Sequence, residues 1–100
     1  MNDIIDSIGL PAVLEQLAEE CSELAQASLK YARLLRGENP TPKSERQCVA
    51  DMTEEVADVN LCLSQLFRNH NIRYDDVIDI IEFKNRRWHE RIQEAHHEEQ

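Results

Sequence analysis

The sequence contains few of the residues that make turns: two glycines and three prolines among 100 residues. A multi-stranded sheet needs more of both, so the composition disfavours a β-rich fold. Aromatic residues make up only 5% of the chain, and the core must therefore consist mainly of Leu, Ile, Val and Ala. We predict an all-α protein, and the length fits a single domain over residues 1–100.

Other absences limit where the protein works and what chemistry it uses. No apolar run approaches the roughly 20 residues of a membrane helix, and the first residues lack the basic segment of a signal peptide. The three cysteines are odd in number and form no CxxC pair, which predicts reduced thiols in a cytoplasmic protein. A glycine-rich phosphate loop is also missing, which excludes P-loop and Rossmann chemistry.

The charge of the chain is strongly one-sided, with a formal net charge of −9. Binding to duplex nucleic acid relies on Lys and Arg that neutralise phosphates, so we expect no duplex partner. A small phosphorylated ligand is still compatible with this charge, because a bound cation can invert the local sign.

Apolar residues recur at spacings of three and four, which predicts helices near residues 11–36, 44–69 and 75–96. Residues 37–43 are the clear loop, Gly37 suits the end of the first helix, and Ser44 with Gln47 suits a capping box at the start of the second. The predicted apolar stripes are Leu10, Leu14, Leu17, Cys21, Leu24, Ser28, Tyr31 and Leu35; Val49, Met52, Val56, Val59, Leu63 and Leu66; and Val77, Ile81, Trp88, Ile92 and Ala95.

Three long helices with so few large side chains bury their apolar faces poorly alone. We therefore predict a helical bundle of three main helices per chain, completed by dimerisation. The expected assembly is a homodimer or a dimer-based tetramer.

Two pairs of acids have a spacing that suits metal binding. Glu20 and Glu23 are three residues apart on the first helix, as are Glu55 and Asp58 on the second. Residues at i and i+3 lie on the same side of a helix, so each pair can bind one side of a divalent cation. Carboxylate oxygens with water as co-ligand are what Mg²⁺ prefers.

Acids are common enough in this chain for such pairs to arise by chance, so their position on the helical wheel matters. With Glu20 or Glu55 at 0°, the apolar stripe spans roughly 20–140° on the first helix and roughly 20–120° on the second, and the second acid lies near 300°. We therefore predict that Glu20 and Glu55 border the core, that Glu23 and Asp58 lie one step outward, and that both pairs line one cleft. Four converging carboxylates repel one another, which favours a cation between them.

Three segments resemble MazG-like nucleoside triphosphate pyrophosphohydrolases. Residues 16–27, QLAEECSELAQA, are similar to the family's first motif helix, with ExxE followed by Leu-Ala. Residues 53–59, TEEVADV, resemble its ExxD motif, and residues 83–87, FKNRR, resemble the basic K-x-x-R of a later helix. The resemblance covers residues 14–91 in the family's order.

The resemblance implies hydrolysis of a nucleoside triphosphate to the monophosphate and pyrophosphate. It implies that Glu20, Glu23, Glu55 and Asp58 hold Mg²⁺, for which Mn²⁺ can substitute, and that one of them takes the proton of the attacking water; which one is left open. Lys84 and Arg87 would hold the substrate's phosphates. The 31 residues between Glu23 and Glu55 are more than is common in the family, and we expect the excess within residues 36–46, where it could form a lid.

Lys30 lies on the helical line of Glu20 and Glu23, so it is the cation of the first helix most suited to meet phosphate. The alternative is that Lys30, Arg33 and Arg36 only complement the helix dipole. Similarly, Lys84 and Arg87 could pair with surface acids, and Trp88 suits a core or dimer contact better than a platform for a base.

Two other kinds of protein remain as alternatives. The chain could be a non-catalytic helical dimer that keeps the fold as a regulatory or assembly module. The second alternative is a ferritin-like di-iron oxidase. Glu94 and His97 match half of its carboxylate motif, but the sequence has no second copy of that motif.

Overall fold

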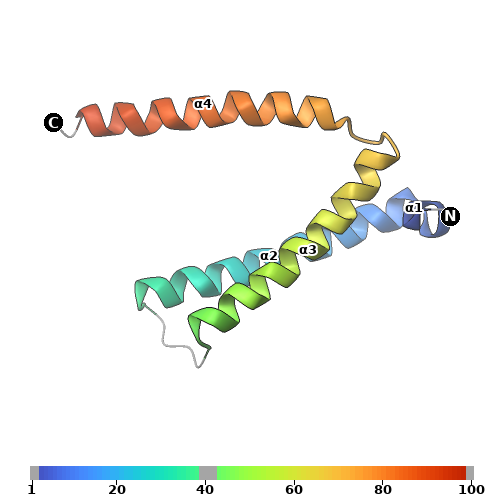
Figure 1. Cartoon of the computed structure of the whole chain (residues 1–100), viewed down its shortest axis with the longest axis horizontal. Helices are drawn as coiled ribbons and strands as arrows, with labels where there is room; N and C mark the ends of the chain where they lie inside the picture. The colour runs from blue at the N-terminus through green and yellow to red at the C-terminus, as the bar shows by residue number, and fades with distance from the viewer. Residues whose placement is uncertain (1–2, 39–42, 99–100) are drawn as a thin grey trace.

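The computed structural model describes residues 3–38 and 43–98, which form four helices and no strand (Figure 1). Helix α1 spans Ile4–Ile8, α2 spans Leu10–Arg36, α3 spans Glu45–Arg68 and α4 spans Tyr74–Glu98. The all-α class agrees with the prediction. The three long helices lie within two residues of the predicted bounds, and α1 is an additional short helix.

The helix ends follow from local chemistry. Gly9, at φ 90°, is the single residue between α1 and α2, and Pro11 lies in the first turn of α2. Gly37 ends α2 in the left-handed region at φ 68°, where glycine lacks the Cβ clash of other residues. At the start of α3, the Ser44 Oγ accepts from the Gln47 backbone N–H (3.2 Å) and the Gln47 Oε1 accepts from the Ser44 N–H (2.8 Å). The lid was predicted within residues 36–46, and residues 39–42 of that segment lie outside the described residues.

Helices α2 and α3 form an antiparallel hairpin, and α1 packs on α2 at the end of the hairpin opposite the α2–α3 loop (Figure 1). The buried apolar cluster consists of Ile5, Val13 and Leu66, with Leu17 packed against it. Cys48 and Cys62 are also buried, whereas Cys21 is exposed, and all three are free thiols. The core therefore belongs to the hairpin and α1.

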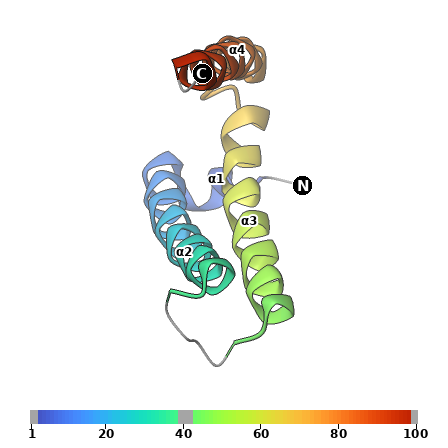
Figure 2. The same cartoon turned by 90° about the vertical axis from the view of Figure 1, so that its left-hand side faces the viewer.

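Helix α4 stands apart from the hairpin in both views (Figure 1, Figure 2). None of its residues is buried; Val77 and Ile78 are half-buried and the remainder are exposed. The radius of gyration is 17.9 Å, whereas a compact domain of this length has about 13 Å. A single chain is thus not a closed bundle. Among the described helices, none is both long enough and apolar enough to cross a membrane.

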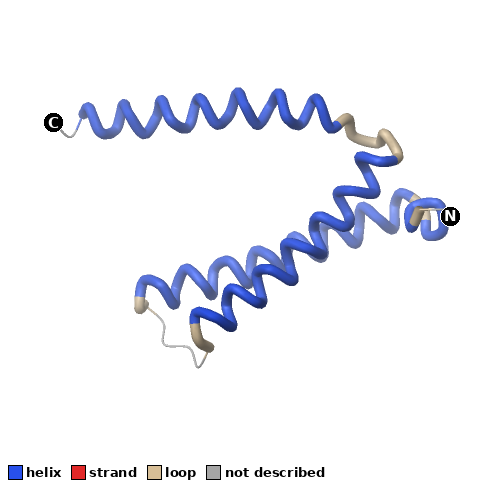
Figure 3. Tube along the Cα trace, viewed as in Figure 1, coloured by secondary structure: helices blue, strands red, loops and turns tan. Residues whose placement is uncertain are grey.

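A short turn sets the direction in which α4 leaves the hairpin (Figure 3). His70 takes a left-handed conformation at φ 60°, and the Leu66 carbonyl accepts hydrogen bonds from the N–H groups of Asn71 (2.9 Å) and Ile72 (3.3 Å). The rings of Phe67 and Tyr74 meet edge to face, with centroids 5.3 Å apart. These contacts give the joint between α3 and α4 a defined geometry.

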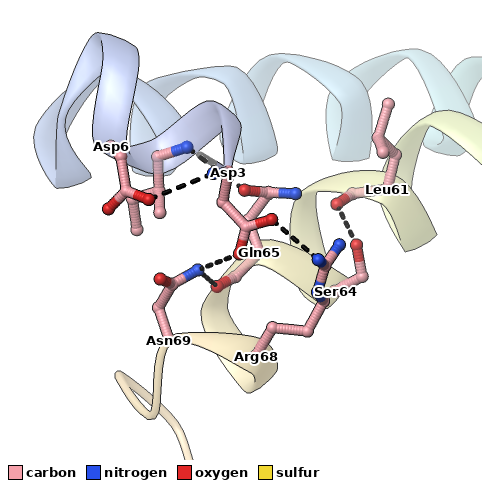
Figure 4. Close-up of polar contacts among 8 residues, drawn as sticks. Asp3, Asp6, Leu61, Ser64, Gln65, Arg68 and Asn69 are labelled. Carbon is pink, nitrogen blue, oxygen red and sulfur yellow. Dashed lines mark hydrogen bonds and ion pairs between the residues drawn. The ribbon is translucent and has the colours of Figure 1, made fainter. Parts of the chain in front are cut away.

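Polar side chains tie α1 to the end of α3 (Figure 4). The buried Gln65 Oε1 accepts from the Ile5 backbone N–H at 3.1 Å. Asp3 binds α3 through both of its oxygens: Oδ1 pairs with Arg68 at 2.8 Å and Oδ2 accepts from the Asn69 amide at 3.1 Å. These contacts hold α1 over the apolar cluster and close that end of the hairpin.

Candidate metal centre

The hairpin brings the four predicted metal ligands together. One carboxylate oxygen from each of Glu20, Glu23, Glu55 and Asp58 can be chosen so that all four lie within 4.8 Å of one another. Two oxygens on opposite sides of a Mg²⁺ ion lie about 4 Å apart, because each bond is about 2.1 Å long. The cluster therefore has nearly the size that one ion requires. Among residues 3–38 and 43–98, no other group of three or more acids, histidines or cysteines is gathered closely enough to hold a metal ion.

The face of α2 that meets α3 differs from the predicted stripe. Leu10, Leu14, Cys21, Ser28 and Leu35 of that stripe are exposed, although Leu17, Leu24 and Tyr31 are half-buried as expected. The seam instead includes Val13 and Ala27, which rotates its centre toward Glu20. Glu20 is therefore half-buried at the seam, beside the buried apolar cluster. Glu23 lies one step outward and is exposed.

Electrostatic repulsion within the cluster opposes ionisation. The negative charge of Glu55, together with burial, raises the pKa of Glu23 above its ordinary value. For Glu20, the hydrogen bond from Gln16 lowers the pKa, but burial and the charges of Glu23 and Asp58 outweigh it and raise the pKa overall. Burial, followed by the charges of Glu20 and Asp58, raises the pKa of the neighbouring Cys62 thiol. The cluster thus favours any cation that relieves the repulsion.

Two oxygens of the cluster are buried without a hydrogen-bond partner: Glu20 Oε2 and Glu55 Oε2. The other Glu20 oxygen accepts from the Gln16 amide at 2.7 Å, which orients the carboxylate. A buried acceptor without a partner is costly, so native sites normally provide a donor, a water or an ion. A set of four carboxylates with two such oxygens fits a hard divalent cation such as Mg²⁺.

An open groove of about 430 Å³ adjoins the cluster on the side of the α2–α3 loop. Lys30 lies in this groove together with Glu23 and Glu55, so the structure brings it to the acids. The groove also contains Lys43, whose ammonium pairs with Asp51 at 2.6 Å. Sequence reasoning missed Lys43, because a loop residue has no periodicity that indicates which way it points.

An apolar pocket of about 110 Å³ adjoins the cluster on the other side, toward α1. Gln16 and Cys62 line this pocket, and Gln16 also donates to Glu20. The remaining lining residues are Ile4, Ile8, Val13, Leu61 and Gln65. The pocket was not anticipated, since α1 was not among the predicted helices.

Lys84 and Arg87 are not brought to the acids within one chain. With Trp88 and Arg91 they line a separate hollow on α4, and the Arg87 guanidinium lies 5.7 Å from the centre of the Phe83 ring. Trp88 is 69% exposed and so does not belong to the core of its own chain.

At the far end of α4, Glu94 and His97 line a hollow with Glu90, Gln93 and Glu98. All of these residues belong to α4 itself. A di-iron centre needs carboxylates and histidines from several facing helices, and no other helix of the described chain supplies them here.

Comparison of the chain with models of protein families, with curated proteins and with solved structures finds no match.

Proposed function

We propose that the protein is a divalent-cation-dependent nucleoside triphosphate pyrophosphohydrolase of the MazG-like kind. The observation that carries the proposal is the cluster of Glu20, Glu23, Glu55 and Asp58, with oxygens within 4.8 Å and two of them buried without a partner. These residues would hold Mg²⁺ or Mn²⁺. Such an ion supplies neutralisation of phosphate charge and a lower pKa for a bound water.

The surfaces on the two sides of the cluster suit the two parts of a nucleotide. The groove with Lys30 and Lys43 offers cations to a polyphosphate, and its volume is within the range of small-molecule sites. The apolar pocket on the α1 side offers a surface for a flat base. Gln16 connects the pocket to the acid cluster, because it lines the pocket and donates a hydrogen bond to Glu20.

The chain's own groups would divide the work as follows. Lys30 would bind phosphate as a compact charge, and Glu20, Glu23, Glu55 and Asp58 would hold the cation beside it. One of the four carboxylates would take the proton of the attacking water.

We also propose that the active form is a homodimer or a dimer-based tetramer. Large apolar side chains stay exposed on the hairpin, including Leu14, Leu35, Val49 and Val56, and others stay exposed on α4. Exposed apolar area of this extent is typical of an interface. It would equally serve a non-catalytic assembly module, so catalysis must be tested directly.

The test is a panel of ordinary and modified nucleoside triphosphates incubated with the protein and Mg²⁺, with the products separated by chromatography. At least one triphosphate should give its monophosphate and pyrophosphate. Glu55→Gln should abolish the reaction and keep the helical circular dichroism, whereas Glu15→Gln, an exposed acid of the same hairpin, should retain it. Orthophosphate as the first product would contradict the proposed bond, and no reaction with any nucleotide would favour the assembly module.

A further inference from the structure

Helix α4 carries an apolar stripe that the described part of its own chain covers only at the start of the helix, where Tyr74 meets Phe67 and Val77 is half-buried. Tyr74, Val77, Ile81, Trp88 and Ile92 lie within an arc of roughly 60° on the helical wheel. Most of these side chains are more than half exposed. The stripe extends from Tyr74 to Ile92, about 27 Å along the helix, and can pack along a partner surface of that length.

Cations border this stripe. Lys84 and Arg91 lie roughly 20–40° from its edge on the wheel, and Arg87 lies one step further. The three line one hollow with Trp88. A surface that receives the stripe therefore also meets these cations, which makes an acidic surface the favourable partner.

The hairpin has such an acidic surface in the groove beside the metal centre. Four acids line it, Glu23, Asp51, Glu54 and Glu55, against the two lysines Lys30 and Lys43. The joint at residues 69–73 directs α4 away from its own hairpin: Leu66 accepts the N–H groups of Asn71 and Ile72, and Phe67 packs on Tyr74. The groove that α4 can reach is thus that of another copy.

We propose that α4 of one copy lies across the acidic groove of a second copy and presents Lys84 and Arg87 to the metal centre there. A two-fold axis makes the exchange reciprocal, so each dimer contains two equivalent sites. Each site then has acids from one chain and the cations that bind outer phosphates from the other. Arg87 can bind a phosphate through two N–H groups, while Lys84 acts as a compact charge.

The catalytic consequence rests on the proposed function, but the docking of α4 can be tested without activity. An equal mixture of ¹⁵N-labelled and unlabelled protein, co-refolded and treated with a zero-length carbodiimide, joins Lys84 to any carboxylate in contact with it. Mass spectrometry should show Lys84 linked to Glu23, Glu54 or Glu55 in cross-linked pairs in which one peptide is ¹⁵N-labelled and the other is unlabelled. Lys84→Arg, which keeps the charge but removes the amine, should lose these products. The proposal would be overturned if the linked peptides were always both labelled or both unlabelled, or if Lys84 formed no link to the groove.

Co-expression of two inactive variants tests the shared site. Glu55→Gln lacks one acid, and the double variant Lys84→Ala/Arg87→Ala lacks the cations. If each site uses both chains, mixed dimers contain one intact site, and random pairing restores about one quarter of wild-type activity. Recovery near zero with an active wild type and verified mixed dimers would show that acids and cations act within one chain. If the wild type hydrolyses no nucleotide, the proposed function fails, and cross-linking alone decides the docking.

Discussion

Helices α2 and α4 have similar amphipathic patterns and nearly equal lengths, yet only α2 packs against another long helix of the chain. α2 packs along α3 and places Val13 and Glu20 in the seam, whereas α4 buries no side chain. The difference arises from the connections. The α2–α3 loop allows an antiparallel return, while the hydrogen-bonded turn after α3 directs α4 outward. An amphipathic pattern thus predicts that a helix has an apolar face, but the pattern does not determine whether the same chain covers that face.

The largest expected effect separates the core of the hairpin from the surface of α4. Leu66 is 1% exposed, so Leu66→Ala should lower the free energy of unfolding by about 2–5 kcal/mol. Ile81→Ala should reduce stability only where copies associate, so its effect should depend on protein concentration. Urea denaturation at several concentrations measures both. An equal, concentration-independent loss for Ile81→Ala would show that α4 packs within its own chain.

Metal binding should stabilise the hairpin, and substitutions in α4 should leave the metal affinity unchanged. At 100 times its dissociation constant, Mg²⁺ or Mn²⁺ should raise the free energy of unfolding by about 2.7 kcal/mol, because the unfolded chain lacks the site. Calorimetric titration should show Asp58→Asn losing metal affinity and Lys84→Ala retaining it. A melting temperature unchanged by millimolar metal would contradict a preformed site.

A smaller effect should follow from the contacts that anchor α1. Gln65 is 4% exposed and accepts from the Ile5 N–H, so Gln65→Leu should cost about 1–3 kcal/mol by leaving that donor unpaired. Gln93→Leu, the same change on exposed α4, is the matched control and should be nearly neutral. Thermal unfolding of the two variants compares them, and equal melting temperatures would mean that the α1 contacts add nothing.

The smallest expected effect is the pH dependence of the metal-free protein. Glu20 and Glu23 have pKa values raised above the ordinary 4.5, so in this range the folded state binds more protons than the unfolded chain. Their contribution to stability is full below pH 4.5 and is lost as the pH rises through the raised pKa values. Glu23→Gln should reduce this loss in melts between pH 4 and pH 7. An identical pH profile for wild type and Glu23→Gln would show that the cluster carries no such repulsion.

Much of the fold could be predicted because its signals are local. Pro11 and Gly37 mark the limits of α2, and Ser44 with Gln47 forms the predicted capping box at α3. The four acids of the candidate site could also be selected from the sequence, since the i,i+3 spacing places each acid pair on one side of its helix. The rotation of the seam toward Glu20 could not be predicted, because the exposed leucines of α2 are as apolar as the buried side chains.

The sequence by itself determined that the chain is helical, where its long helices begin and end, and which four acids can act together. Backbone hydrogen bonding, capping and side-chain periodicity act over a few residues, so the order of amino acids specifies them. Only the tertiary structure decided that Gln65 binds the Ile5 backbone, that Lys43 joins the groove and that α4 leaves the hairpin. These contacts join residues far apart in sequence or depend on the path of a turn, and no local pattern contains that information.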